Sequence, residues 1–103
     1  SPINGGEEGY GFLVTRPFNR IMACRVYCNA YATPGTVVGV QIAPGGTHGT
    51  YLGNHFMARE GHEMKLAFGG TLEGAYVAGN SYTPTVLGGK VDQQAGPRYG
   101  GNA

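Results

Sequence analysis

Three histidines recur every seven residues and are the first place to look for metal or acid–base chemistry. On a helix, His48, His55 and His62 would form one stripe, because seven residues make close to two helical turns. Glycines stand between and beside them, and glycine is a poor helix former. The spacing therefore predicts separate surface or turn histidines. A metal site is the alternative, since tertiary folding could still bring the imidazoles together.

Two familiar catalytic motifs begin in the sequence but are not completed. His62 and Glu63 start like the zinc-protease motif His-Glu-x-x-His, but Leu66 stands where the second histidine is required. The only serines are Ser1 and Ser81, and neither lies in a Gly-x-Ser-x-Gly elbow. The sequence therefore predicts neither of these two kinds of hydrolase.

The carboxylates are few and scattered, whereas a glycosidase needs two that face each other across a cleft. Glu60 and Glu63 fall within one polar turn, where solvation accounts for both. The full set is Glu7, Glu8, Glu60, Glu63, Glu73 and Asp92. Glycine pairs do not precede predicted helices, so a phosphate-binding loop is not expected. We expect no enzyme activity, no catalytic or metal residues and no cofactor.

The two cysteines lie on one predicted strand. Cys24 and Cys28 would have Cα atoms about 13 Å apart at the rise of an extended chain. A disulfide requires Cα atoms within about 7 Å, so the two should not pair. Buried, reduced thiols are expected, and a metal site on a turn is the alternative.

The elements that would position these residues are organised around residues 18–40. We expect two antiparallel strands joined at Thr33-Pro34-Gly35, each with one face buried. The buried face of the first strand would carry Met22, Cys24, Val26, Cys28 and Ala30, and that of the second Val38, Val40 and Ile42.

The 103 residues include 20 glycines and 6 prolines, which favour many turns and short strands over helices. Further strands are expected at 12–15, 47–58 (with a kink or bulge at a glycine), 64–68, 72–78 and 82–87. The prediction is an all-β chain: a single antiparallel β-sandwich or jelly-roll-like barrel of about seven or eight strands over 12–92, without an internal repeat. Residues 1–11 would be a flexible arm and 93–103 a glycine-rich tail.

Charge is low: 13% of residues are charged and the net charge is +1. A free monomer usually carries more surface charge, so we expect self-association or docking to a larger assembly. Without a basic stripe, nucleic acid is not an expected partner. No apolar run approaches the roughly 20 residues that span a bilayer, so no membrane is expected. The interface candidates are Tyr10, Tyr31, Arg98 and Tyr99.

Residues 15–27, the turn and valine-rich strand of 32–40, and Gly88-Gly89 before a closing strand resemble small β-sandwich modules of tailed-phage virion proteins. The resemblance implies a non-enzymatic viral structural protein, a capsid decoration (cement) or fibre-head module. It implies a homo-oligomer, possibly a trimer, bound to a major capsid or other virion protein, with assembly in the host cytoplasm and the virion as its location.

Two other functions stay open. A carbohydrate- or receptor-binding β-sandwich module could hold its ligand in loops at 45–53 and 60–63. A small metal-dependent β-barrel enzyme could use two or three of the histidines.

Overall fold

The computed structural model describes residues 2–5, 10–28, 37–59 and 61–91. These residues form strands joined by turns, and they contain no helix. The strands are β1 (Pro2–Gly5), β2 (Tyr10–Val14), β3 (Arg20–Met22), β4 (Arg25–Cys28), β5 (Val37–Ile42), β6 (Thr50–Leu52), β7 (His55–Ala58), β8 (Met64–Gly70), β9 (Tyr76–Ala78) and β10 (Ser81–Tyr82). The expected all-β class is confirmed.

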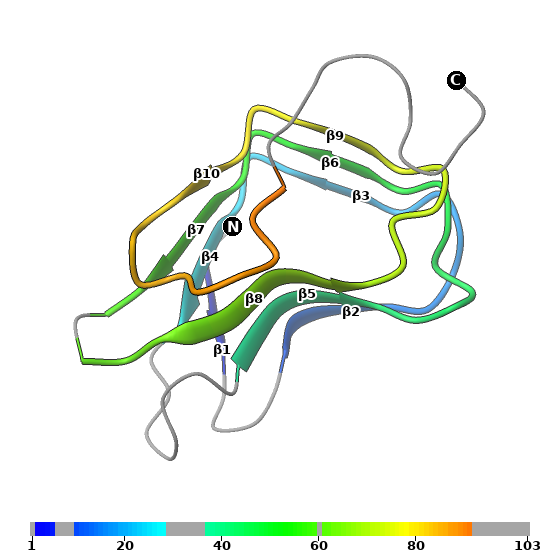
Figure 1. The fold of residues 1–103 in the computed structure, drawn as a ribbon. Coiled ribbons are helices and arrows are strands. Elements are labelled where there is room, and N and C mark those ends of the chain that lie inside the picture. Colours follow the sequence, from blue (N-terminus) through cyan, green and yellow to red (C-terminus); the bar gives the residue numbers. More distant parts are fainter. Residues whose placement is uncertain (1, 6–9, 29–36, 60, 92–103) are drawn as a thin grey trace.

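The strands build three parallel sheets, with the orders β1-β4-β7-β10, β2-β5-β8 and β3-β6-β9. The chain visits the three sheets in turn and then repeats the circuit one layer further along, as a parallel β-helix does (Figure 1). We call the circuits coil 1 (β2, β3, β4), coil 2 (β5, β6, β7) and coil 3 (β8, β9, β10). Each coil contacts mainly its neighbours, as in other solenoids.

The predicted antiparallel sandwich is therefore wrong. Residues 18–40 do not form a hairpin, because β4 pairs with β1 and β7, whereas β5 pairs with β2 and β8. All strand pairings among the described residues are parallel. Alternation shows that a strand has a buried face but not the direction of its neighbour, so the same pattern fits both arrangements. The expectation of no internal repeat is also wrong, because the chain makes the same three-strand circuit three times.

A corner at Ala23 divides what the sequence suggested was one strand. Ala23 has a φ of 55°, and the equivalent corners of coils 2 and 3 hold Gly53 (65°) and Gly79 (68°). This left-handed residue resets the alternation, so that Ile21 and Val26 are both buried. Met22, predicted to be buried, is instead exposed. The single strand expected over 47–58, with a kink or bulge at a glycine, is instead two strands in different sheets, β6 and β7, and Gly53 is the corner between them.

Next to this corner, asparagine side chains link the coils. Asn54 is buried: its Oδ1 accepts from the Cys24 N–H (2.9 Å) and its Nδ2 donates to the Ile21 carbonyl (2.9 Å). Asn80 repeats the arrangement one coil further on, with Oδ1 accepting from the Asn54 N–H (2.8 Å) and Nδ2 donating to the Tyr51 carbonyl (3.0 Å). We call this pair of asparagines the asparagine ladder. It supplies hydrogen-bond partners to main-chain groups at the corner.

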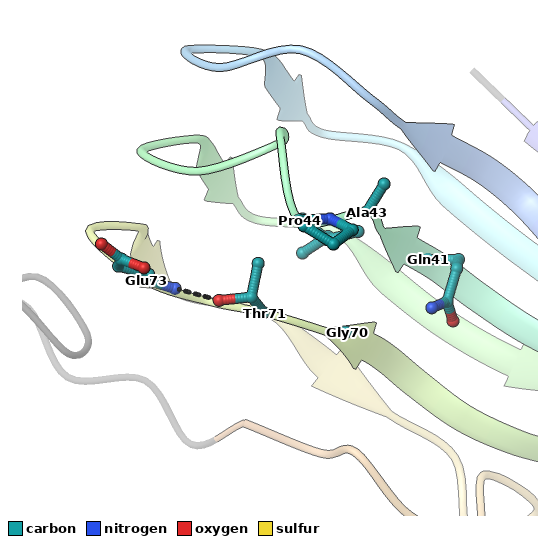
Figure 2. A pocket seen from close by; sticks show the side chains of 7 residues that line it. Gln41, Ala43, Pro44, Gly70, Thr71 and Glu73 are labelled. Carbon is teal, nitrogen blue, oxygen red and sulfur yellow. Dashed lines mark hydrogen bonds between the residues drawn. The ribbon is translucent and has the colours of Figure 1, made fainter.

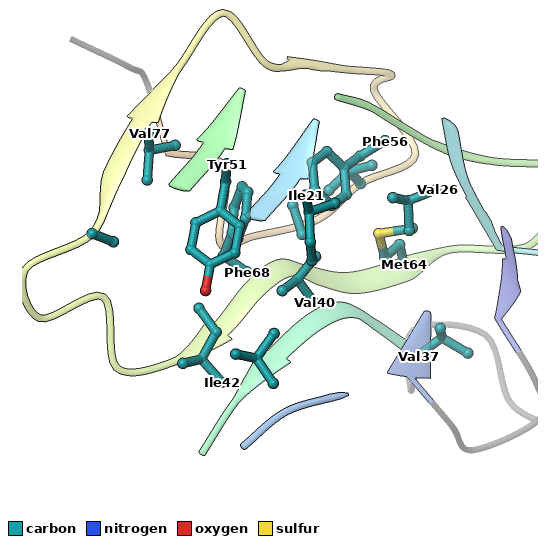
Figure 3. Close-up of a cluster of buried hydrophobic side chains, with 14 of the residues drawn as sticks. Ile21, Val26, Val37, Val40, Ile42, Tyr51, Phe56, Met64, Phe68 and Val77 are labelled. Carbon is teal, nitrogen blue, oxygen red and sulfur yellow. The ribbon is translucent and has the colours of Figure 1, made fainter. Parts of the chain in front are cut away.

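The core fills the space between the three sheets (Figure 3). Aromatic rings occupy its middle, with centroid distances of 4.9 Å for Phe56–Phe68 and 5.4 Å for Tyr51–Phe68. The remaining buried members are mostly aliphatic: Val14, Ile21, Val26, Val37, Val40, Ile42, Ala58, Met64, Ala67, Ala75, Val77 and Val86.

The two ends of the stack differ. Beyond coil 3, Val86 forms a parallel bridge with Met64 and is fully buried, and the Tyr82 hydroxyl donates to the Val91 carbonyl (2.7 Å). Residues 83–91 thus cover part of that end. At the opposite end, β1 lies along β4, but no described strand lies along the outer edges of β2 and β3. β1 falls within the expected N-terminal arm; the expected tail, 93–103, lies outside the described residues.

Candidate functional site

The three histidines lie in different surroundings. The His48 ring lies 5.6 Å from the Phe18 ring at a turn of the stack, and the His62 N–H donates to the Arg59 carbonyl. His55 is on β7, where its Nδ1 lies 2.6 Å from the Ser81 Oγ on β10. Within the described ranges, no three His, Cys, Asp or Glu side chains gather as a metal site would require.

The His55–Ser81 contact joins a possible base to a possible nucleophile within hydrogen-bond reach. Ser81 is exposed, and the residue in register with His55 on the other side is Arg25 rather than a carboxylate that could orient the imidazole. We therefore interpret the His55–Ser81 contact as a hydrogen bond between the paired strands β7 and β10 and not as part of a catalytic triad.

Cys24 forms no disulfide, as predicted. It does not share a strand with Cys28, as the prediction assumed, because it lies at the corner before β4. It is half-buried rather than buried, and its Sγ donates weakly to the Met22 carbonyl at 3.4 Å. Cys24 occupies the corner position that Asn54 and Asn80 hold in the later coils. The side chain of Cys28 lies outside the described residues.

A shallow pocket of about 320 Å³ lies where coils 2 and 3 turn (Figure 2). Its polar groups come from Gln41, Thr71 and Glu73, and the Glu73 N–H donates to the Thr71 Oγ1 (3.1 Å). The other lining residues are Ile42, Ala43, Pro44 and Gly70. The set could hydrogen-bond sugar hydroxyls, but it provides no aromatic ring for stacking.

Exposed apolar side chains concentrate at coil 1. The described residues contain five exposed large hydrophobic side chains: Tyr10 (48%), Leu13 (56%), Phe18 (73%), Met22 (47%) and Leu87 (53%). The first four belong to β2, β3 and the turn between them. Solenoids normally end in a coil with a polar outer face, so this clustering is unusual.

Three exposed arginines, Arg16, Arg20 and Arg25, share this coil, and residues 10–28 contain no Asp or Glu. We call the seven exposed side chains Tyr10, Leu13, Arg16, Phe18, Arg20, Met22 and Arg25 together the coil 1 surface; they come from β2, the turn after it, β3 and β4, which belong to three different sheets. Aromatic residues, methionine and arginine are the types enriched at protein interfaces. The composition therefore fits a surface that another protein covers.

Phe18 is held in a costly conformation. Its φ of 63° is left-handed, which costs a residue with a Cβ about 1–2 kcal/mol. His48 has the same conformation in coil 2, but coil 3 uses Gly74 (φ 67°), the residue that avoids the cost. Phe18 is also the most exposed of the large hydrophobic side chains in the described residues, at 73%.

Of the predicted interface candidates, Tyr10 lies on the coil 1 surface, whereas Tyr31, Arg98 and Tyr99 lie outside the described residues. The sequence reasoning missed Leu13, Phe18 and Met22. Met22 was missed because alternation was continued through the corner at Ala23. The Gly-Asn pairs at 53–54 and 79–80 mark the equivalent corners of coils 2 and 3, but coil 1 has Ala23-Cys24 there.

Comparisons with known proteins add no identity: no protein-family model matches the chain, and no curated protein or solved structure matches it. Within the described ranges there is also no helix that is long and apolar enough to cross a membrane.

Proposed function

We propose that this is a non-enzymatic structural protein that works by docking to other proteins through the coil 1 surface. The observation that carries the proposal is the clustering of four of the five exposed large hydrophobic side chains on one coil. Coil 1 is the coil at the end of the stack where β1 covers only β4. The outer edges of β2 and β3 have no described strand partner there.

The energetics are compatible with docking. Full burial of one large apolar side chain is worth about 1.5–3 kcal/mol. Four partly exposed side chains can therefore offset a substantial part of the association cost, which is about 4–15 kcal/mol. Arginine contacts at the rim would add selectivity for the partner.

In its narrower form, the proposal is a virion surface protein. Such a protein would assemble in the host cytoplasm, associate with copies of itself and decorate a capsid or another virion component. The low charge supports this form. The resemblance to virion β-sandwich modules no longer supports it, because the sandwich arrangement is wrong for this chain.

A carbohydrate-binding module is the second candidate, and the pocket beside Thr71 favours it. Saturation-transfer NMR with a panel of oligosaccharides would test it, using Glu73→Gln as the variant. We expect no binding there, because the pocket has no aromatic platform. Saturable binding that Glu73→Gln weakens would favour the second candidate over the first.

Photo-crosslinking in the cells that make the protein tests the docking proposal. A photoreactive amino acid is placed at Leu13, and at Leu87 as a matched control: both side chains are exposed leucines, but Leu87 lies beyond coil 3. We expect one dominant crosslinked protein from Leu13 that Met22→Glu abolishes. Equal crosslinking from both positions, or none from Leu13, would contradict the proposal.

A further inference from the structure

We infer that the partner contributes an acidic, extended segment, which adds as a strand to the outer edge of β3. The inference rests on the proposed docking function and names the chemistry of the partner. It follows from three features of coil 1. The outer edge of β3 has no described strand beside it, β1 already extends the neighbouring sheet at this end, and exposed arginines lie on this coil.

The hydrogen bonds of coil 1 define the available edge. Thr50 N–H donates to the Asn19 carbonyl (2.8 Å), and Ala23 N–H donates to the Leu52 carbonyl (2.9 Å). Odd-numbered residues of this segment therefore direct their main-chain groups toward β6. In a parallel ladder, alternate residues direct theirs to opposite sides.

By the same alternation, Arg20 and Met22 direct their N–H and C=O groups away from β6. No described strand lies on that side. Among the described residues, the Met22 carbonyl accepts a weak thiol contact from Cys24 at 3.4 Å, which is no ladder hydrogen bond. Sheet edges of this kind are what an extended peptide recognises when it binds by strand addition.

β1 shows how this end of the stack accepts an extended segment. It lies parallel to β4 with Pro2 opposite Arg25, and it extends that sheet by one strand beyond coil 1. The β3 sheet lacks the corresponding strand among the described residues. A partner segment would occupy the equivalent position on β3.

The side chains around the edge select for charge. Arg20 and Met22 are exposed along β3, and Arg16 and Phe18 are exposed in the preceding turn. A segment on this edge would meet both cations and apolar groups. Since residues 10–28 carry three arginines and no carboxylate, an acidic segment is the complementary occupant.

A second copy fits this edge less well. Face to face, the arginines of two coil 1 surfaces would meet. If two copies stacked end to end, coil 3 of one copy would lie on coil 1 of the other. The Asn80 main-chain N–H would then face Cys24 of the second copy, which has no side-chain oxygen to accept it. Coil 3 is moreover partly covered by residues 83–91. An acidic polysaccharide would satisfy the arginines but not the main-chain edge.

The test uses a synthetic peptide that alternates Glu with Val as the probe. Two matched peptides accompany it: one with Gln in place of Glu, and one that keeps Glu but is N-methylated at alternate residues. Fluorescence anisotropy gives the affinities, and amide NMR locates the binding. We expect the Glu peptide to bind and to protect the Arg20 and Met22 amides from exchange.

Arg20→Gln is the test variant, and Arg59→Gln, an exposed arginine beyond β7, is its control. An exposed ion pair changes affinity by about 1.4- to 5-fold, so Arg20→Gln should weaken binding by that factor and Arg59→Gln should not. Circular dichroism confirms that both variants are folded.

The inference is overturned if none of the peptides binds, or if the Gln peptide or the N-methylated peptide binds as well as the Glu peptide. Binding by heparin together with indifference to N-methylation would indicate a charged-polymer surface instead. If the peptides fail while the Leu13 crosslink persists, the acidic strand is wrong and the docking function stands.

Discussion

Replacing Tyr51 by Phe should make the protein more stable. Tyr51 is fully buried on β6, with its ring among the core residues (Figure 3). Its hydroxyl is a buried side-chain polar atom without a hydrogen-bond partner among the described residues. Tyr51→Phe removes this oxygen and leaves the ring in place.

The size of the effect follows from two opposing contributions. A buried polar group without a partner costs about 1–3 kcal/mol, which the variant recovers. The space left by one oxygen atom, roughly 10–15 Å³, costs about 0.3 kcal/mol at ~24 cal/mol per Å³. The free energy of unfolding should therefore rise by about 0.7–2.7 kcal/mol. A gain of 1 kcal/mol raises the Tm of a chain of this size by roughly 4–8 °C.

Urea unfolding followed by far-UV circular dichroism measures this difference, and Tyr82→Phe is the matched control. The Tyr82 hydroxyl donates to the Val91 carbonyl at 2.7 Å, so the same chemical change there removes a formed hydrogen bond. Tyr82→Phe should lower the free energy of unfolding by about 0.5–1.5 kcal/mol. The two variants should thus change stability in opposite directions.

Alkaline pH gives a second measurement on the same residue. Burial raises the pKa of Tyr51 above its usual value of 10.0 in the folded protein. Above the unfolded pKa, the unfolded chain releases the Tyr51 proton first, so the free energy of unfolding of the wild type falls as pH rises toward the folded pKa; below the unfolded pKa this loss is absent. The advantage of Tyr51→Phe should therefore grow above pH 10, by at most about 1.4 kcal/mol per pH unit.

A Tyr51→Phe variant that is less stable than the wild type by 1 kcal/mol or more would refute this reasoning. That result would mean that the hydroxyl has a partner, such as a buried water. An unchanged stability difference above pH 10 would refute the account of the raised pKa.

Three further substitutions test the corners. Asn54→Ala should lower the free energy of unfolding by about 2–4 kcal/mol in urea unfolding, because one buried and one partly buried main-chain group lose their partners; a loss below 1 kcal/mol would contradict the ladder. Ala23→Gly should raise it by about 0.5–1 kcal/mol, because relief of the left-handed strain outweighs the added unfolded-state entropy. Phe18→Gly should leave stability within about 1 kcal/mol of wild type but weaken crosslinking from Leu13; unchanged crosslinking would remove Phe18 from the docking surface.

Sequence reasoning identified local structure well and long-range pairing poorly. The strand expected at 64–68 is β8, and the glycine at which a kink was expected within 47–58 is Gly53, the corner between β6 and β7. These features depend on alternation and on glycine chemistry, which neighbouring residues determine. Whether strands pair in parallel depends on where the chain returns, and local patterns do not contain that information.

The repeat was visible in principle. Residues 51–56, Tyr-Leu-Gly-Asn-His-Phe, and 77–82, Val-Ala-Gly-Asn-Ser-Tyr, share a Gly-Asn pair followed two residues later by an aromatic residue. The coils differ in length and coil 1 has Ala-Cys at this corner, so the third instance is hidden. A coil-by-coil alignment would have found the corners of coils 2 and 3.

Coil 1 departs from the other coils at the positions that matter most for stability. Where the later coils have Gly at the corner, coil 1 has a strained Ala23. Where they have the ladder asparagine, it has Cys24. At the position of Gly74 in coil 3, coil 1 has the exposed, left-handed Phe18, and coil 2 has His48 in the same conformation. The strain at Ala23 is found in coil 1 alone among the three coils, whereas the strain at Phe18 is shared by His48 in coil 2. Coil 1 also holds four of the five exposed large apolar side chains of the described residues and a strand edge that no described strand covers. Backbone strain and exposed apolar side chains in the same coil are expected if a partner binds there. Burying these side chains on binding would offset free energy that the isolated fold loses.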